Sequence, residues 1–311
     1  MTAPVWQTWT ALGLVYVVWG STYLGIRYVV ESLPSLLTAG VRFAVAAALA
    51  GTWLLVRRGP AAFRADRRQL ATAAVVGLLL LLGGNGGVTL AEDADLPSGL
   101  TALLVAGVPL WVVVLRWARR DRPTTTTVLG VVLGFAGLAV LLLPGARPEG
   151  LGPVPVLLVI GSSLLWAVGS FVASRGALPA DPLLTTVVQM LAGAVGLTVA
   201  GLLRGEELDT SAVQTSSVVA LGYLIVFGSL VAFTAYSWLL SNAPISWVST
   251  YAYVNPVVAV LLGVWLVDEQ VTVTTVVGGA ITLAAVAVVV AEEGRRRRLA
   301  AAPAQVAAPT R

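Results

Sequence analysis

The sequence predicts an all-α integral membrane protein in which ten transmembrane helices form two inverted repeats of five helices. Hydrophobic residues make up 58% of the 311 residues and charged residues only 11%, whereas a soluble domain carries about 25% charged residues. Apolar runs of 18 or more residues, long enough to span a bilayer, recur along the chain. The two halves of the sequence also resemble each other. Lipid is therefore the expected solvent for most of the surface.

Ten apolar segments are the predicted helices, and each is about 20 to 27 residues long, enough to cross the hydrocarbon core with some tilt. They are residues 9–30, 34–56, 70–91, 97–117, 124–143, 153–173, 183–203, 214–240, 243–267 and 271–291. Residues typical of turns separate them. Clear examples are ESLPS, RRGPAAFRADRRQ, EDADLPSG, PGARPEGLGP, LPADP and SNAP.

Arginine, the only basic residue in the chain, gives the predicted orientation. If both termini are cytoplasmic, fifteen of the 19 arginines fall in inner loops or the C-terminal tail, and only Arg147 and Arg204 fall in outer loops. Cytoplasmic loops of membrane proteins carry such an excess of positive charge. We therefore expect a multi-pass protein of the plasma or inner membrane with both termini in the cytoplasm. The first apolar run lacks a basic n-region and a cleavage site, so we expect it to be retained as the first helix.

An internal repeat becomes visible when the sequence is shifted by 147 residues. The coinciding pairs are Trp19 with Trp166, Pro97 with Pro244, Pro109 with Pro256, and Asp121 with Asp268. The predicted repeats span residues 10–143 and 153–291. Five helices are an odd number, so the second repeat must enter the membrane in the opposite sense, as in many secondary transporters. Residues 292–311 are predicted to be a disordered cytoplasmic tail, whose arginine run either sets topology or binds anionic lipid or a partner.

Four segments of the chain resemble one family of membrane proteins. They are VVWGSTYLGIRYVVESLPSLLTAGVRF at 17–43, GNGGVTLAEDADLPSGL at 84–100, SSLLWAVGS at 162–170 and STYAYVNPVVAVLLG at 249–263. Together they are similar to the EamA branch of the drug/metabolite transporter superfamily, in particular its YedA-type inner-membrane members. The resemblance covers residues 10–291 and implies ten helices, two EamA repeats and export or exchange of small molecules. The family often has Gly-Glu after the ninth helix, where this chain has Asp268 and Glu269.

Polar residues inside the predicted spans are the candidate substrate-binding residues, because they are costly in lipid and tend to face a cavity. In the third helix, Asn85 and Glu92 lie on one face with Thr89 between them, next to several glycines. In the first helix, Trp19 and Thr22 share a face, and Trp166 takes the place of Trp19 in the repeat. Paired tryptophans are able to stack on an organic substrate or cation. The alternatives are close packing for the glycine-rich helix and interface anchoring for the tryptophans.

The ninth and eighth helices supply the next candidates. Tyr253 and Asn255 precede Pro256, which removes one backbone donor and frees a carbonyl inside the membrane. A concentration of polar groups at this point favours a cavity wall. Tyr236 on the eighth helix is a further candidate. The glycine pair Gly130 and Gly134 in the fifth helix is better explained by helix packing.

Arg42 is the one charged residue in the stretch GVRFAVAAALAGTWLLV. It lies eight residues after Pro34, about 12 Å along the helix. No acidic residue lies at the same depth in any predicted helix. Arg42 therefore either snorkels to the interface or offers its guanidinium to an anionic group of a substrate. In the second case Trp19, Trp166 and Tyr253 would cover the apolar part of an amino-acid-like substrate.

Composition excludes several functions. The chain has no cysteine and no histidine, so we predict no catalytic residues, no metal site and no cofactor. A serine protease within the membrane would need histidine or lysine as base, and an aspartyl protease would need two aspartates within the spans. We therefore predict no enzyme but a secondary transporter, an exporter of small organic metabolites that works by alternating access. A channel or facilitator is the alternative, although no filter or charged ring is visible.

The remaining expectations concern partners and coupling. The net charge of +4 is explained by cytoplasmic arginine, so no nucleic acid is expected. The expected partners are a small-molecule substrate and the lipid bilayer, with the chain a monomer or a homodimer. No carboxylate lies in the middle of a span, so proton coupling should be weak or pass through Glu92 alone.

Overall fold

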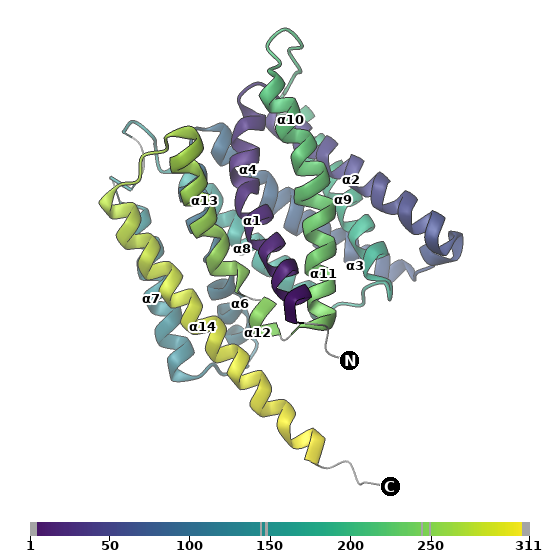
Figure 1. The fold of residues 1–311 in the computed structure, drawn as a ribbon, viewed down its shortest axis with the longest axis vertical. Coiled ribbons are helices and arrows are strands. Elements are labelled where there is room, and N and C mark those ends of the chain that lie inside the picture. Colours follow the sequence, from purple (N-terminus) through teal and green to yellow (C-terminus); the bar gives the residue numbers. More distant parts are fainter. Residues whose placement is uncertain (1–4, 144, 147–148, 244, 249, 307–311) are drawn as a thin grey trace.

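Every regular element that the structure describes is a helix. The structure, a computed structural model, describes residues 5–143, 145–146, 149–243, 245–248 and 250–306, and no strand occurs among them. Arg147, Pro244, Ser249 and residues 307–311, which enter the sequence analysis, lie outside this part of the chain. The long elements are α1 (Val5–Val30), α2 (Ser35–Arg58), α7 (Thr125–Leu141), α8 (Val154–Ala173), α9 (Pro182–Leu203), α13 (Tyr251–Val267) and α14 (Val273–Val306) (Figure 1).

The shorter elements join into longer rods. They are η1 (Pro60–Phe63), α3 (Arg67–Gly77), η2 (Leu78–Asn85), α4 (Gly86–Asp93), α5 (Ser98–Val105), α6 (Val108–Ala118), α10 (Thr215–Tyr223), η3 (Leu224–Val231), α11 (Ala232–Asn242) and α12 (Ile245–Val248). The elements α3, η2 and α4 follow one another without a break, as do α10, η3 and α11. Both η2 and η3 are π-helical, a conformation that is rare and frequently found at functional sites. They occupy corresponding places in the third and eighth predicted segments.

Among the residues that the structure describes, eight helices or joined rods are long and apolar enough to cross a membrane. The two other apolar helices, Thr125–Leu141 and Tyr251–Val267, are shorter. Every predicted apolar segment therefore contains a helix, and the prediction of a multi-pass helical protein is confirmed. The number of crossings and the inverted relation of the two halves stay predictions.

Two closely packed helix pairs flank the bundle. At one side α2 packs along α9, and at the other α7 packs along α14 (Figure 1). A Cβ atom on Gly40 would lie 2.4 Å from Thr198 Oγ1, so α2 and α9 approach too closely for any larger residue. Gly130 and Gly134 likewise face Val289 and Leu110 at short distance, which confirms that they serve packing.

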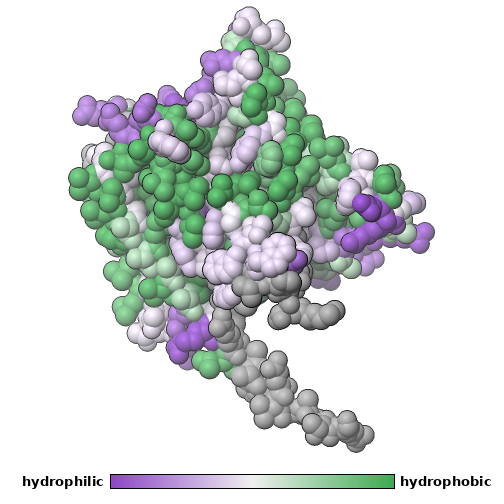
Figure 2. All heavy atoms as spheres, viewed as in Figure 1, coloured by the Kyte–Doolittle hydropathy of each residue, from purple (hydrophilic) through white to green (hydrophobic). Residues whose placement is uncertain are grey.

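The surface shows how the bundle meets its surroundings. In Figure 2 hydrophobic residues cover the middle of the visible face, and hydrophilic residues gather in patches near its edges. Large apolar side chains such as Trp265, Val195 and Leu261 are exposed, which suits contact with lipid.

The two ends of the described chain lie toward the same end of the molecule, since α1 begins and α14 finishes there (Figure 1). Where the sequence analysis predicts a disordered tail from residue 292, α14 continues as a helix to Val306.

Candidate functional site

Arg42 lies inside the bundle and has few partners. Arg42 is only 6% exposed, although it lies just seven residues after the start of α2. Its Nε donates to Ser229 Oγ at 3.2 Å, and its guanidinium lies 4.8 Å from the centroid of the Phe43 ring. Within the described chain no carboxylate lies at ion-pair distance from it. Its positive charge is thus held in the protein interior without a fixed counter-ion.

An aromatic cluster surrounds Trp19 on α1. The Trp19 ring centroid lies 5.0 Å from that of Tyr236, 5.4 Å from that of Tyr251 and 6.0 Å from that of Phe233. Tyr236 and Tyr251 also contact each other edge to face, at 5.7 Å. Such clusters present apolar faces with polar tips. We call Trp19, Tyr236, Tyr251 and Phe233 the Trp19 cluster.

The π-helical segment η3 connects Arg42 to the Trp19 cluster. The indole Nε1 of Trp19 donates to the carbonyl oxygen of Gly228 at 3.2 Å, and the next residue, Ser229, accepts from Arg42. Thr22 also faces this point, because a Cβ atom on Gly228 would lie 3.1 Å from the Thr22 methyl group and 3.3 Å from an Arg42 Nη. The Thr22 hydroxyl donates to the carbonyl of Trp19 at 2.6 Å. The structure therefore brings Trp19, Thr22, Arg42 and Tyr236 together around one turn of η3.

The other predicted site residues lie elsewhere in the bundle. Trp166 on α8 packs against Gly84, whose Cβ atom would lie 2.7 Å from its ring. Tyr253 packs against the apolar cluster formed mainly by α5, α6, α7, α8 and α14, away from the Trp19 cluster. Asn255 is 8% exposed, and its Oδ1 has no hydrogen-bond partner within the described chain, as is also true of Asn85. Trp166 and Tyr253 thus do not join Trp19, and Tyr251 and Phe233 contact it instead.

Glu206 and Glu269, both in the second half of the chain, cap the N-termini of two helices in the first half. The N-cap residues of α2 and α5 are Pro34 and Pro97, whose side chains have no hydrogen-bond acceptor. The first backbone N–H groups of these two helices therefore need an acceptor from another part of the chain. Glu269 supplies it for α5: Ser98 N donates to its Oε1 at 2.7 Å and Gly99 N to its Oε2 at 3.0 Å.

Glu206 plays the same part at the start of α2. The amides of Leu36 and Leu37 each donate to its Oε2 at 2.9 Å, and Ser35 Oγ donates to Oε1 at 3.0 Å. Negative charge at a helix N-terminus is favourable. In both corners the residue before the glutamate has a positive φ, 73° at Gly205 and 53° at Asp268, which turns the chain back toward the capped helix. Gly205-Glu206 and Asp268-Glu269 therefore form the same kind of turn in two places of this chain.

Glu92 lies at the same end of the bundle but has no such partners. It is 0% exposed, and neither of its carboxylate oxygens has a hydrogen-bond partner within the described chain. The Arg27 guanidinium donates instead to the backbone carbonyl of Glu92 at 3.2 Å and to Asp95 Oδ1 at 2.9 Å. Arg27 thus forms its ion pair with Asp95, although Glu31 lies four residues further along the chain.

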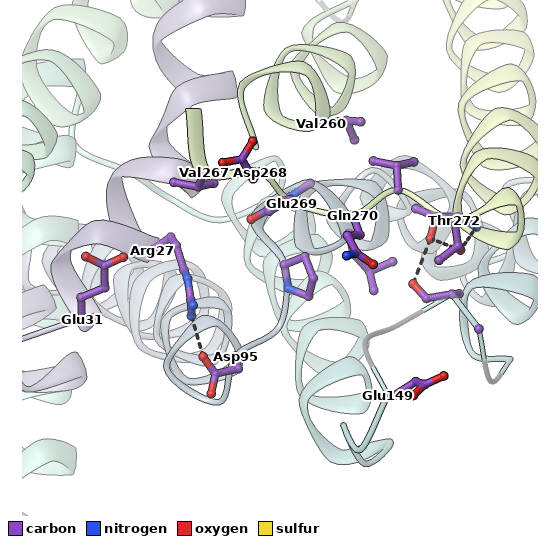
Figure 3. Close-up of a pocket in the computed structure, with 17 residues that line it drawn as sticks. Arg27, Glu31, Asp95, Glu149, Val260, Val267, Asp268, Glu269, Gln270 and Thr272 are labelled. Atoms are coloured by element: carbon purple, nitrogen blue, oxygen red, sulfur yellow. Dashed lines mark hydrogen bonds and ion pairs between the residues drawn. The ribbon is translucent and has the colours of Figure 1, made fainter. Parts of the chain in front are cut away.

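A pocket of about 850 Å³ opens beside this group. Its lining includes Arg27, Glu31, Asp95, Glu149, Asp268 and Glu269. Figure 3 shows Arg27 extending from α1 to Asp95, with Asp268 and Glu269 on the connection between α13 and α14. Most of the charged groups here are acidic, so the pocket favours cations or the ammonium end of a zwitterion.

At the opposite end of the bundle, arginine ion pairs connect the helices. Arg116 at the end of α6 pairs with Asp121 at 2.5 Å and with Glu293 on α14, and Arg296 pairs with Asp121 at 3.0 Å. The hydrogen bond from Arg116 holds the pKa of Asp121 below its usual value. Another ion pair, Arg58 with Asp181 at 2.6 Å, joins the end of α2 to the start of α9.

The capping role of Glu206 and Glu269 was not predicted from the sequence, and Ser229 and Tyr251 were not among the candidate binding residues. A signal for the caps was present, because the helices that they cap both begin with LPS, at 33–35 and 96–98. Proline before a helix leaves its first amides without a local acceptor, which calls for one from another part of the chain.

These features define a class: a multi-pass helical membrane protein with an apolar outer surface and buried polar groups, as transporters have. The model of the EamA-like transporter family matches the chain twice, over residues 8–143 and 154–291. The chain belongs to this family, which confirms the resemblance seen in the sequence. Family members are transporters and not enzymes.

Individual relatives agree. The chain is 41% identical to the Uncharacterized inner membrane transporter YedA of Escherichia coli K12, over 82% of this chain and 81% of the relative. It is 24% identical to the Probable amino-acid metabolite efflux pump of the same organism, over 83% and 86%. A solved crystal structure with 21% identity superposes with a TM-score of 0.62 and covers 93% of this chain and 98% of its own, which shows a shared fold.

Proposed function

We propose that this protein is a secondary transporter that exports small organic metabolites by alternating access between two inverted five-helix repeats. The support is the double family match, the internal repeat in the sequence, and the corresponding positions of η2 and η3. The excess of arginine in the predicted inner loops supports an orientation with both termini in the cytoplasm. The substrate and the lipid bilayer are the proposed partners, and the transporter acts as a monomer or homodimer.

The proposed substrate has an anionic end beside an apolar body, as an amino acid does. One observation carries this: Arg42 is buried, has no carboxylate partner within the described chain, and is joined through Gly228 and Ser229 to the Trp19 cluster. A guanidinium in that position is able to bind a carboxylate through two hydrogen bonds, and the aromatic rings cover apolar groups. The relative named as a probable amino-acid metabolite efflux pump agrees with this class.

Arg42 provides the test of this site. Counterflow of leucine, phenylalanine and threonine in liposomes should identify a transported amino acid in the wild type. Arg42→Ala should lower its transport about 10- to 100-fold, because a charged hydrogen-bonded contact contributes about 1.5–3 kcal/mol. Arg42→Lys should restore transport only in part, since the planar fork is lost.

The matched control is Arg57→Ala, which removes an exposed arginine that lies over Trp53 and should transport as the wild type does. Normal transport by Arg42→Ala would show that the substrate binds elsewhere. A flux that never saturates and shows no counterflow would instead favour the channel.

The orientation has a separate test, helped by the absence of native cysteine. Ala61→Cys and Ala94→Cys each place one thiol at an exposed position, in the connections after α2 and after α4. In intact cells a membrane-impermeant maleimide should label the thiol at position 94 and leave that at position 61 unlabelled until the cells are opened. The reverse pattern would mean that both termini face outward.

A further inference from the structure

Glu92 is completely buried, and its carboxylate has no hydrogen-bond partner in the part of the chain that the structure describes. Its exposure is 0%, and neither carboxylate oxygen accepts a hydrogen bond within the described chain. An ionised carboxylate in such a place is very costly, and buried charges are normally paired. Glu269, at the same end of the bundle, accepts two backbone N–H bonds. The difference calls for a function that needs Glu92 without fixed partners.

Within the described chain, no cation forms an ion pair with the Glu92 carboxylate. Arg27 and Tyr23 face it from α1, and Glu269 faces it from the connection after α13. Arg27 directs one guanidinium nitrogen to Asp95 and to the backbone of Glu92, and Glu269 is a second negative charge. Asp93, the residue after Glu92, accepts a hydrogen bond from the hydroxyl of Ser35. The elements α2, α5 and α8, which also pack on α4, bring no cation to the Glu92 carboxylate within the described chain.

A route for protons lies next to Glu92. Arg27 and Glu269, which interact electrostatically with Glu92, line the pocket of about 850 Å³ at this end together with Asp95, the ion-pair partner of Arg27 (Figure 3). Arg27 contacts both the backbone carbonyl of Glu92 and Asp95, whose side chain is 79% exposed, so this ion pair connects the segment that carries Glu92 to the pocket. If this ion pair opens, water reaches Glu92 and Arg27 becomes free to act as the counter-ion of an ionised carboxylate.

We propose that Glu92 carries the proton that drives transport, that it is protonated in the conformation described, and that it exchanges this proton through the Arg27–Asp95 pocket. In the loading step a hydronium ion in the pocket gives its proton to a Glu92 oxygen and leaves as water. The neutral carboxyl is then buried as the Arg27–Asp95 ion pair forms. The transport role rests on the proposed function, whereas the protonation of Glu92 does not.

Infrared difference spectroscopy of the full chain in lipid tests the protonation without any substrate. At neutral pH the wild type should show the C=O stretching band of a protonated carboxyl group, and Glu92→Gln should lose it. The control Glu269→Gln should keep the band, because the carboxylate oxygens of Glu269 accept from the amides of Ser98 and Gly99 and the band is assigned to Glu92. Glu92→Gln should also remain folded, since glutamine has the size of protonated glutamate. Absence of the band in the wild type, its persistence in Glu92→Gln, or failure of Glu92→Gln to fold would each overturn the proposal.

Two further measurements separate the possible outcomes. Sodium chloride added at constant pH should leave the band unchanged. Its loss on addition of sodium would assign the site to a metal cation instead. In liposomes, a pH gradient should accelerate the flux of the transported amino acid in the wild type, and the ratio of rates with and without the gradient should fall to about one in Glu92→Gln. If no amino acid is transported at all, the function proposed above fails, while the infrared band still decides the protonation of Glu92.

Discussion

Glu269 and Glu92 lie at the same end of the bundle, but their carboxylates differ in their hydrogen-bond partners. Glu269 accepts from the amides of Ser98 and Gly99, so its charge is fixed at a helix N-terminus, where charge is favourable. Glu92 is more deeply buried and accepts nothing within the described chain. Burial alone therefore does not assign a role to an acidic residue in a membrane protein. The hydrogen-bond partners of its carboxylate assign that role.

The largest expected effect comes from removing the capped carboxylate. Glu269→Ala leaves two buried amides without an acceptor, which should lower the free energy of unfolding by about 2–4 kcal/mol. Glu92→Gln should change it by less than about 1 kcal/mol, because no hydrogen bond is lost. Thermal unfolding of both variants in detergent, followed by circular dichroism, measures the difference. Equal losses in the two variants would mean that Glu92 has a structural partner.

A smaller effect is expected from the turns that aim the capping glutamates. Gly205 has a φ of 73° and Asp268 a φ of 53°, and this region costs a residue with a Cβ about 1–2 kcal/mol. Gly205→Ala should therefore destabilise the protein by about 1 kcal/mol, although a Cβ atom there meets open space. Asp268→Gly should raise stability by up to about 1 kcal/mol. The same unfolding assay applies, and a stabilising Gly205→Ala would contradict this account of the turn.

The smallest effect is expected at Asp121, a partly exposed carboxylate at the opposite end. Asp121→Asn removes two ion pairs, which should cost about 0–1 kcal/mol because water screens them. Its folded-state pKa is lowered by the hydrogen bond from Arg116, so the contribution is present above the unfolded-state value of about 3.9. It is lost as the pH falls through the lower folded-state value. Unfolding of wild type and variant should therefore converge in acid, and a difference that grows in acid would contradict the assignment.

The fold was predictable because it depends on properties that one segment carries by itself. The length and hydropathy of each apolar run predicted a helix in its place, and each of the ten runs contains one. The glycines of α7 were also correctly assigned to packing. The helix at the C-terminal end was not predictable in this way. The arginine-rich segment after residue 291 has no apolar pattern, yet α14 continues through it.

The site was only partly predictable, because it depends on which faces meet. Trp19, Thr22, Arg42 and Tyr236 were named from their own helices, and the structure brings them together around η3. Trp166 entered through its match to Trp19 in the repeat, but a matching position in the other half need not face the same space.

The capping glutamates could not be paired from sequence. Glu269 bonds to residues about 170 positions earlier in the chain, and no local pattern encodes such a contact. The aromatic partner Tyr251 was passed over in favour of Tyr253, two residues away on the same helix. Two residues turn a helix by about 200°, so this small change in sequence moves a side chain to the opposite face.

The π-helical turn of η3 carries a consequence for how such proteins diverge. A π-helical turn contains more residues than an α-helical one, so deleting a single residue within Leu224–Val231 would let the segment relax into an α-helix. Because the extra residue is taken up within the π-helical turn itself, α11 would keep its orientation, and Tyr236 and Phe233 would still face Trp19. The backbone carbonyl of Gly228 and the hydroxyl of Ser229, which contact Trp19 and Arg42, would move. We therefore expect a single-residue deletion in this segment to change substrate choice in one evolutionary step, while the aromatic cluster and the number of helices stay the same.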